Sequence, residues 1–145
     1  MSLSRALAAS ALLTLCTLAP ACRSEPTDAT ASSATPTSDA LPPGPYGDRD
    51  PALAKQLVDG GALLLDVRTP REFADGHVEG AVNISHDEVP ARLDEIRELA
   101  GGDAHHPVVI YCRSGGRAGK AKAALLEAGF DRVTNLGGLS DWPAE

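Results

Sequence analysis

The sequence predicts an α/β fold in which short, buried parallel strands alternate with helices. Short apolar runs rich in Val, Leu and Ile recur at residues 62–67, 81–84, 107–111 and 132–136. The segments between them carry apolar residues at helical spacing, and most end at a glycine. Apolar runs without alternation are typical of strands that are covered on both faces, as in a parallel sheet flanked by helices.

The helical segments are marked by their end signals. Asp50 and Pro51 have the usual order of an N-cap and a first helical residue, and Gly60 follows the last apolar residue of that segment. Further helical segments are predicted at 70–75, 88–100 and 116–128.

A cysteine follows the third apolar run and precedes a predicted helix. In a parallel sheet, ligands bind at the carboxyl ends of the strands, which is where Cys112 falls. Helix N-terminal amides and nearby cations lower the pKa of a thiol, and Gly115 and Gly116 allow the backbone to turn several N–H groups inward. The sequence therefore predicts a reactive thiolate in a loop that holds negative charge.

The positions of the three cysteines support this interpretation. Cys16 and Cys22 lie near the N-terminus, so Cys112 is alone in the part predicted to fold and has no partner there for a disulfide. The structural alternative is a buried core cysteine, but such residues are seldom followed by Arg-Ser-Gly-Gly-Arg. We interpret Cys112 as a nucleophile.

Residues 1–45 are predicted to be an export signal and a tether. Residues 1–21 contain Arg5 and then a mostly apolar stretch of fourteen residues at 6–19, which is too short to span a bilayer. Residues 22–45 are rich in Ser, Thr, Ala and Pro and predict a flexible tether. The folded domain is expected at 46–145.

The end of the signal has two interpretations. The segment from Leu18 to Cys22 resembles the bacterial lipoprotein box, although its leucine lies one position further from the cysteine than usual. That resemblance implies that Cys22 is lipidated and that the protein is periplasmic, held to a bacterial membrane only through its lipid. The alternative is ordinary cleavage after small residues, which gives a freely soluble exported protein. We favour the lipoprotein.

The charge of the chain argues against nucleic acid as a partner. The chain has 13 Lys and Arg against 20 Asp and Glu, a net charge of −7. Proteins that bind the phosphate backbone carry basic patches, so no nucleic-acid partner is expected.

Four segments in order resemble the rhodanese family. They are Leu64 to Phe73, Gly76 to Ile84, Cys112 to Ala118, and Gly137-Gly138 with Trp142. The resemblance implies a three-layer fold, a central mostly parallel sheet of about five short strands flanked by helices. It also implies that Cys112 is the nucleophile that carries a persulfide, that Asp66 and Arg68 support the site, and that the substrate-binding loop consists of Arg113, Ser114, Gly115, Gly116 and Arg117.

The same resemblance implies the activity. Rhodaneses move a sulfane sulfur from a small anionic donor such as thiosulfate to a thiol, cyanide or protein acceptor, and they need no metal or organic cofactor. Arg117 has two possible roles, contact with substrate or an ion pair with Asp66 or Glu72 that supports the loop. We favour support.

Two alternatives to this enzyme remain. One is a persulfide carrier or sulfide sensor with little turnover of small molecules. The other is a phosphatase or arsenate reductase, whose related loops have seven residues from cysteine to arginine, whereas residues 112–117 make six. The shorter ring suits one sulfur atom better than a tetrahedral oxyanion.

Overall fold

The structure is a computed structural model that describes residues 41–144. The described residues all belong to one compact unit. The predicted signal peptide, Cys22 and most of the predicted tether lie outside the described residues. None of the helices formed by residues 41–144 has the length and apolar character needed to cross a membrane.

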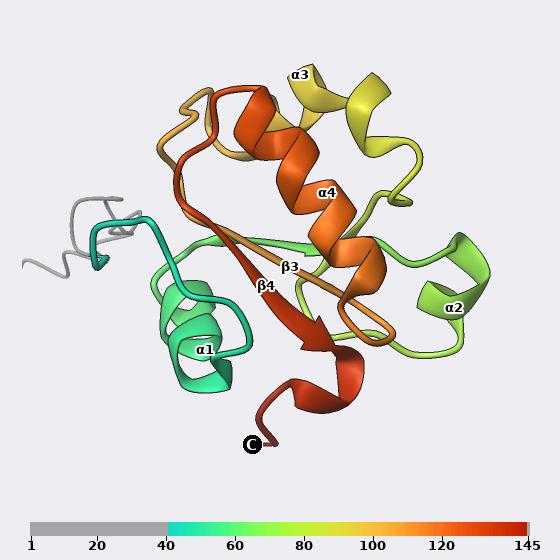
Figure 1. Cartoon of the computed structure of the whole chain (residues 1–145). Helices are drawn as coiled ribbons and strands as arrows, with labels where there is room; N and C mark the ends of the chain where they lie inside the picture. Colours follow the sequence, from blue (N-terminus) through green and yellow to red (C-terminus); the bar gives the residue numbers. More distant parts are fainter. Residues whose placement is uncertain (1–40, 145) are drawn as a thin grey trace, which may run out of the picture. The chain divides into compact units, whose positions relative to one another are not determined.

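The centre of the described part is a parallel sheet of four strands in the order β2-β1-β3-β4 (Figure 1). The strands are β1 (Leu63–Asp66), β2 (Val82–Asn83), β3 (Val108–Cys112) and β4 (Val133–Gly138). The parallel α/β fold is confirmed, but the expected count of about five strands is one too high for the described residues.

The reason for the smaller count lies beside β4. There the backbone N–H of Arg49 donates to the carbonyl of Asn135 at 2.9 Å. This irregular segment is bounded by Pro45 and Pro51, which have no N–H to donate to a sheet. The segment therefore covers part of the edge of β4 without forming another strand.

Alternate residues of β3 face two separate apolar layers. Val108, Ile110 and Cys112 pack on the side of α3 (Leu93–Leu99) and α4 (Gly116–Glu127). Val109 and Tyr111 pack on the other side, with α1 (Pro51–Asp59). Figure 1 shows α4 lying along β3 and β4. All five residues of β3 are buried, so the strand runs through the centre of a three-layer structure.

The helix starts follow the predicted capping rules. The Asp50 carboxylate accepts the N–H of Leu53 at 3.0 Å at the start of α1. At the start of α2 (Pro70–Ala74), Thr69 and Glu72 form a capping box, in which each side chain accepts the backbone N–H of the other. Both helices begin with proline, as expected.

The prediction of one continuous helix at residues 88–100 is wrong. The structure has a 3-10 turn, η2 (Val89–Ala91), and then the separate helix α3. Pro90 has no N–H, and Arg92 leaves helical geometry with φ of −116°. Within α3, Ile96 is buried whereas Leu99 is 43% exposed.

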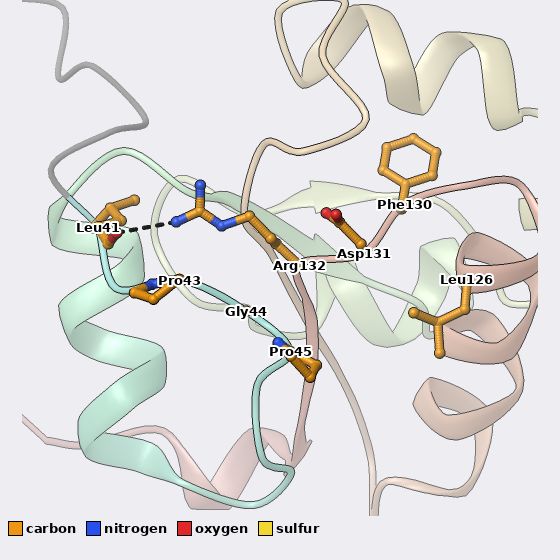
Figure 2. A pocket seen from close by; sticks show the side chains of 8 residues that line it. All are labelled: Leu41, Pro43, Gly44, Pro45, Leu126, Phe130, Asp131 and Arg132. Carbon is orange, nitrogen blue, oxygen red and sulfur yellow. Dashed lines mark hydrogen bonds between the residues drawn. The ribbon is translucent and has the colours of Figure 1, made fainter.

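Packing contacts begin before the predicted start of the domain at Tyr46. The Arg132 side chain donates to the carbonyls of Leu41 at 3.1 Å and Pro42 at 2.7 Å. Figure 2 shows this segment beside Arg132, around a hollow of about 750 Å³. Arg132 precedes β4 and therefore lies at the amino end of the sheet, opposite the end at which β3 delivers Cys112. Residues 41–45 thus pack on the domain, although we predicted them as tether.

Candidate active site

The sulfur of Cys112 lies at the carboxyl end of β3, inside a turn of backbone. Cys112 is 1% exposed, and the N–H of Gly115 donates to its Sγ at 3.1 Å. Gly115 has φ of +93°, and a Cβ there would lie 3.0 Å from Nη2 of Arg49 and 3.2 Å from Cα of Gly137. The backbone can therefore close around the sulfur in this way only with glycine at 115.

The pKa of the Cys112 thiol is lowered from its ordinary value. Burial raises the pKa, because it disfavours the charged form. The backbone N–H groups of Ser114, Ala118, Gly115 and Arg117 oppose burial and together outweigh it. Two of these groups lie in the first turn of α4, whose amides have no partners within the helix. The arrangement stabilises a thiolate through backbone dipoles.

A second glycine motif allows the loop to pack against β4. The ideal Cβ of a residue at 138 would lie 2.7 Å from the carbonyl oxygen of Arg113, which is closer than real Cβ contacts come. Gly138 is opposite Cys112 in the register of β3 and β4. The Gly137-Gly138 pair noted in the sequence therefore gives the loop room to lie over the end of β4.

Arg117 forms a two-pronged ion pair with a carboxylate from another helix. Its Nη1 and Nη2 atoms donate to Oε2 and Oε1 of Glu72 at 2.7 and 2.8 Å. The hydrogen bonds from Arg117 and from the backbone N–H of Thr69 hold the pKa of Glu72 well below its usual range. Of the two carboxylates predicted as possible partners of Arg117, Glu72 is the one that it contacts. This ion pair connects α4 to α2.

The other candidate carboxylate, Asp66, has a partner in its own segment. Asp66 is fully buried, and Arg68 donates to it through Nε at 2.9 and 3.0 Å and through Nη2 at 2.6 Å. Arg68 also donates to the carbonyl of Gly76 at 2.6 Å. The pair thus joins the end of β1 to the turn after α2.

An open hollow of about 840 Å³ lies over the loop that follows Cys112. Three cationic side chains and one carboxylate are among the residues that line it. The lining residues are Glu72, Arg113, Ser114, Gly116, Arg117 and Lys120. Arg117 is paired with Glu72, whereas no ion pair is found for Arg113 or Lys120 among residues 41–144. The hollow therefore offers two uncompensated positive charges to an anion.

Three residues near the loop were missed by reasoning from the sequence. Arg49 donates to the carbonyl of Ser114 at 3.2 Å, and Asn135 donates to the carbonyl of Gly115 at 3.1 Å. Asp48 accepts the backbone N–H of Asn135 at 3.0 Å. The available signal was Asn135 itself, which with Thr134 is one of two polar side chains in a buried strand.

The fold and this loop define a class of protein. The profile of the rhodanese-like domain matches residues 50–145, and the chain belongs to that family. A sulfurtransferase of Allochromatium vinosum is 40% identical over 93 residues, which cover 63% of this chain and 81% of that protein. The thiosulfate sulfurtransferase PspE of Escherichia coli is 40% identical over 77 residues, covering 53% of this chain and 70% of that protein.

Solved structures agree with this assignment. A rhodanese with anions from E. coli is 38% identical, with a TM-score of 0.51, over 57% of this chain and 95% of that one. The human single-domain sulfurtransferase TSTD1 is 26% identical, with a TM-score of 0.56, over 68% of this chain and 96% of that one. The named relatives indicate the sulfurtransferase class within the family.

Proposed function

We propose that this protein is a sulfurtransferase that carries a sulfane sulfur as a persulfide on Cys112. The observation that carries the proposal is the N–H of Gly115, 3.1 Å from Sγ, together with the other loop amides that lower the pKa of the thiol. A thiolate is the nucleophilic form of cysteine, and these amides favour it over the neutral thiol. The named sulfurtransferase relatives support the same chemistry.

The first step is attack by the Cys112 thiolate on the outer sulfur of thiosulfate. A bond forms between Sγ and that sulfur, the sulfur–sulfur bond of thiosulfate breaks, and sulfite leaves with the electron pair. The product is a Cys112 persulfide with one negative charge on its outer sulfur. Amides that point into the loop before the reaction can stabilise this charge without reorganising.

The second step returns the cysteine to its starting state. A thiophilic acceptor, such as cyanide or a thiolate, attacks the outer sulfur and takes it, and the electron pair of the broken bond returns to Sγ. The same amides again stabilise the thiolate. After the two steps Cys112 is again a thiolate, so the protein is neither oxidised nor reduced over a full cycle.

The charges around the hollow suit a dianionic donor. Arg113 and Lys120 line the hollow and have no ion-pair partner among the described residues, so their fields add there. Arg117 is held by Glu72 and acts on the loop from its side, in a supporting role. Arg113 and Lys120 thus attract the donor, and the amides bind the transferred sulfur.

Intact mass spectrometry of the purified protein after thiosulfate treatment tests the proposal. One added sulfur, located on the peptide that contains Cys112 and removed by cyanide with release of thiocyanate, is the expected result. Turnover of thiosulfate and cyanide separates an enzyme from a persulfide carrier or sulfide sensor, which would take up the sulfur and release it slowly. Absence of the added sulfur would overturn the assignment of Cys112.

The oxyanion alternative is tested in parallel. The Arabidopsis protein named HIGH ARSENIC CONTENT 1 is 39% identical over 98 residues, 57% of its length, so arsenate is a necessary comparison substrate. Arsenate reduction or aryl phosphate hydrolysis as efficient as sulfur transfer would replace the proposed reaction. We expect both to be far slower.

For location, we propose export and lipidation at Cys22. The support is the sequence alone: a short apolar segment that ends in small residues before a cysteine. Palmitate labelling of the protein in a bacterial host should disappear in Cys22→Ala. Labelling absent from the unsubstituted protein would leave export without an anchor.

A further inference from the structure

The peptide units of the loop present their N–H groups to the sulfur only because their carbonyls point away from it. A peptide unit is planar and trans, so its C=O and N–H groups point in opposite directions. The N–H of Gly115 donates to Sγ of Cys112, and the carbonyl of the same unit belongs to Ser114. Whatever binds that carbonyl fixes the direction of the N–H group at the sulfur.

Arg49 binds that carbonyl. Its Nη2 donates to the Ser114 oxygen at 3.2 Å, across 65 residues of sequence. One peptide unit is therefore held from both sides, by the sulfur through its N–H and by a guanidinium through its oxygen. The backbone of Arg49 has a φ of +59°, which is uncommon for a residue other than glycine.

Asn135 acts on the carbonyl of Gly115, the residue whose own N–H donates to the sulfur. Its Nδ2 donates to the carbonyl of Gly115 at 3.1 Å, and its Oδ1 accepts the N–H of Gly137 at 3.0 Å. Asn135 is 7% exposed and lies where the pairing of β3 with β4 shifts register. The side chain thus connects the irregular end of β4 to the residue of the loop that has positive φ.

Arg49 and Asn135 belong to one hydrogen-bond network. The backbone N–H of Arg49 donates to the carbonyl of Asn135 at 2.9 Å, while Asp48 accepts the N–H of Asn135 at 3.0 Å and an N–H of Lys122 at 2.5 Å. Residues 48 and 49 are therefore fixed on β4 and on α4 together. The backbone of Arg49 is thus tied to β4, and its exposed side chain reaches the loop.

We propose that Arg49 and Asn135 are positioning residues for sulfur transfer. Arg49 holds the carbonyl of Ser114 outward so that the N–H of Gly115 stays aimed at Cys112. Asn135 holds Gly115 itself in place through its carbonyl. The functional meaning of this inference rests on the proposed sulfurtransferase activity. Both side chains act through Gly115, Arg49 on the peptide unit before it and Asn135 on the carbonyl after it.

The test measures the ionisation of Cys112 in the full-length protein. The rate of alkylation by iodoacetamide is followed against pH on the Cys112 peptide by mass spectrometry, for the wild type, Arg49→Gln and Asn135→Leu. We expect the pH midpoint of alkylation to rise by about half a unit in Arg49→Gln, because the N–H of Gly115 is no longer aimed at the thiolate. We expect a rise of similar size in Asn135→Leu, because Gly115 loses a hydrogen bond that holds it in place. The other charged groups around the loop stay unchanged: Glu72, Arg113, Arg117, Lys120, Asp48 and Lys122.

Arg97→Gln is the matched control, since Arg97 donates to the carbonyl of Ala128 at 3.1 Å, away from the loop. Arg97→Gln should have the same pH midpoint of alkylation as the wild type. If Asn135→Leu does not fold, Arg49→Gln decides the question, because the Arg49 side chain is exposed and its loss leaves the core intact.

Two results would overturn the inference. One is a pH midpoint of alkylation in folded Arg49→Gln that equals the wild-type midpoint. The hydrogen bond from Arg49 to Ser114 would then have no effect on the ionisation of Cys112. The other is a shift in Arg49→Gln that vanishes in high salt, which would assign Arg49 an effect of charge alone. Alkylation requires no sulfur donor, so these results are independent of whether the protein transfers sulfur.

Discussion

The ends of β1 and β3 lie side by side and use opposite means to stabilise a buried anion. Asp66 ends β1 and pairs in the register with Tyr111, the residue before Cys112. Its charge is neutralised by the Arg68 guanidinium, with contacts from 2.6 to 3.0 Å. Cys112 ends β3, and its sulfur is surrounded mainly by backbone N–H groups.

The difference separates a structural group from a reactive one. A carboxylate in contact with a full cation has its electron pairs engaged in fixed hydrogen bonds. Backbone amides carry only partial charges, so they favour the ionised thiol and leave it able to attack. Arg117 on α4 also interacts with the Cys112 sulfur, but its charge is shared with the Glu72 carboxylate. Two neighbouring strand ends thus hold one group for stability and one for chemistry.

Replacing Cys112 should give the largest effect. Cys112→Ser keeps the size of the side chain but replaces the thiolate with a hydroxyl that stays protonated at neutral pH. We expect the rate of thiosulfate–cyanide sulfur transfer to fall by about a thousandfold or more. Circular dichroism should show an intact fold. A serine variant that retains the wild-type rate would remove Cys112 from the chemistry.

Replacing Asp66 should act on stability instead. Asp66→Asn leaves the buried Arg68 charge without its partner, and we expect the free energy of unfolding in urea to fall by about 3 kcal/mol. The control is Asp59→Asn, which breaks the exposed pair with Lys55 and should cost well under 1 kcal/mol. Equal losses in the two variants would contradict the contrast drawn between the strand ends.

Replacing Glu72 should weaken the site more than the fold. Glu72→Gln removes the charge that holds Arg117, and we expect kcat/KM for thiosulfate to fall about tenfold while stability changes by less than 1 kcal/mol. Glu95→Gln is the matched control, because Glu95 forms a similar two-pronged pair with Arg92 on α3. Similar losses of activity in both variants would show that the Glu72 pair has no special relation to the loop.

Much of this contrast was visible in the sequence, and the parts that were missed depend on long-range contacts. The apolar runs predicted the strands, and the Arg-Ser-Gly-Gly-Arg segment predicted the loop around Cys112, because both are encoded locally. Arg49 and Asn135 reach the loop from 65 and 20 residues away, and no local pattern specifies such contacts. The break before α3 falls at Arg92, two residues after Pro90. Proline is tolerated in the first turn of a helix, so Pro90 alone does not predict it.

The pH dependence of the reaction should reflect the amide environment of the thiol. Because the pKa of Cys112 is lowered, kcat/KM should rise with pH and reach half its plateau below about 8.5, the ordinary thiol value. The same shift favours the folded state above the pKa of the unfolded thiol, and this stability is lost as pH falls through the folded pKa. A midpoint at or above the ordinary value would mean that burial outweighs the amides.

The smallest effect should come from Lys120, which lines the hollow with Arg113 and is too far along α4 to shape the loop. Lys120→Gln should raise KM for thiosulfate about threefold at low salt and leave kcat unchanged, because the lysine attracts the dianion without stabilising the transferred sulfur. The difference should shrink as salt screens the charge. Lys55→Gln removes the same charge from α1 and should leave KM unaltered. If both lysine variants raised KM equally, the net charge of the protein, and not the hollow, would govern capture of the donor.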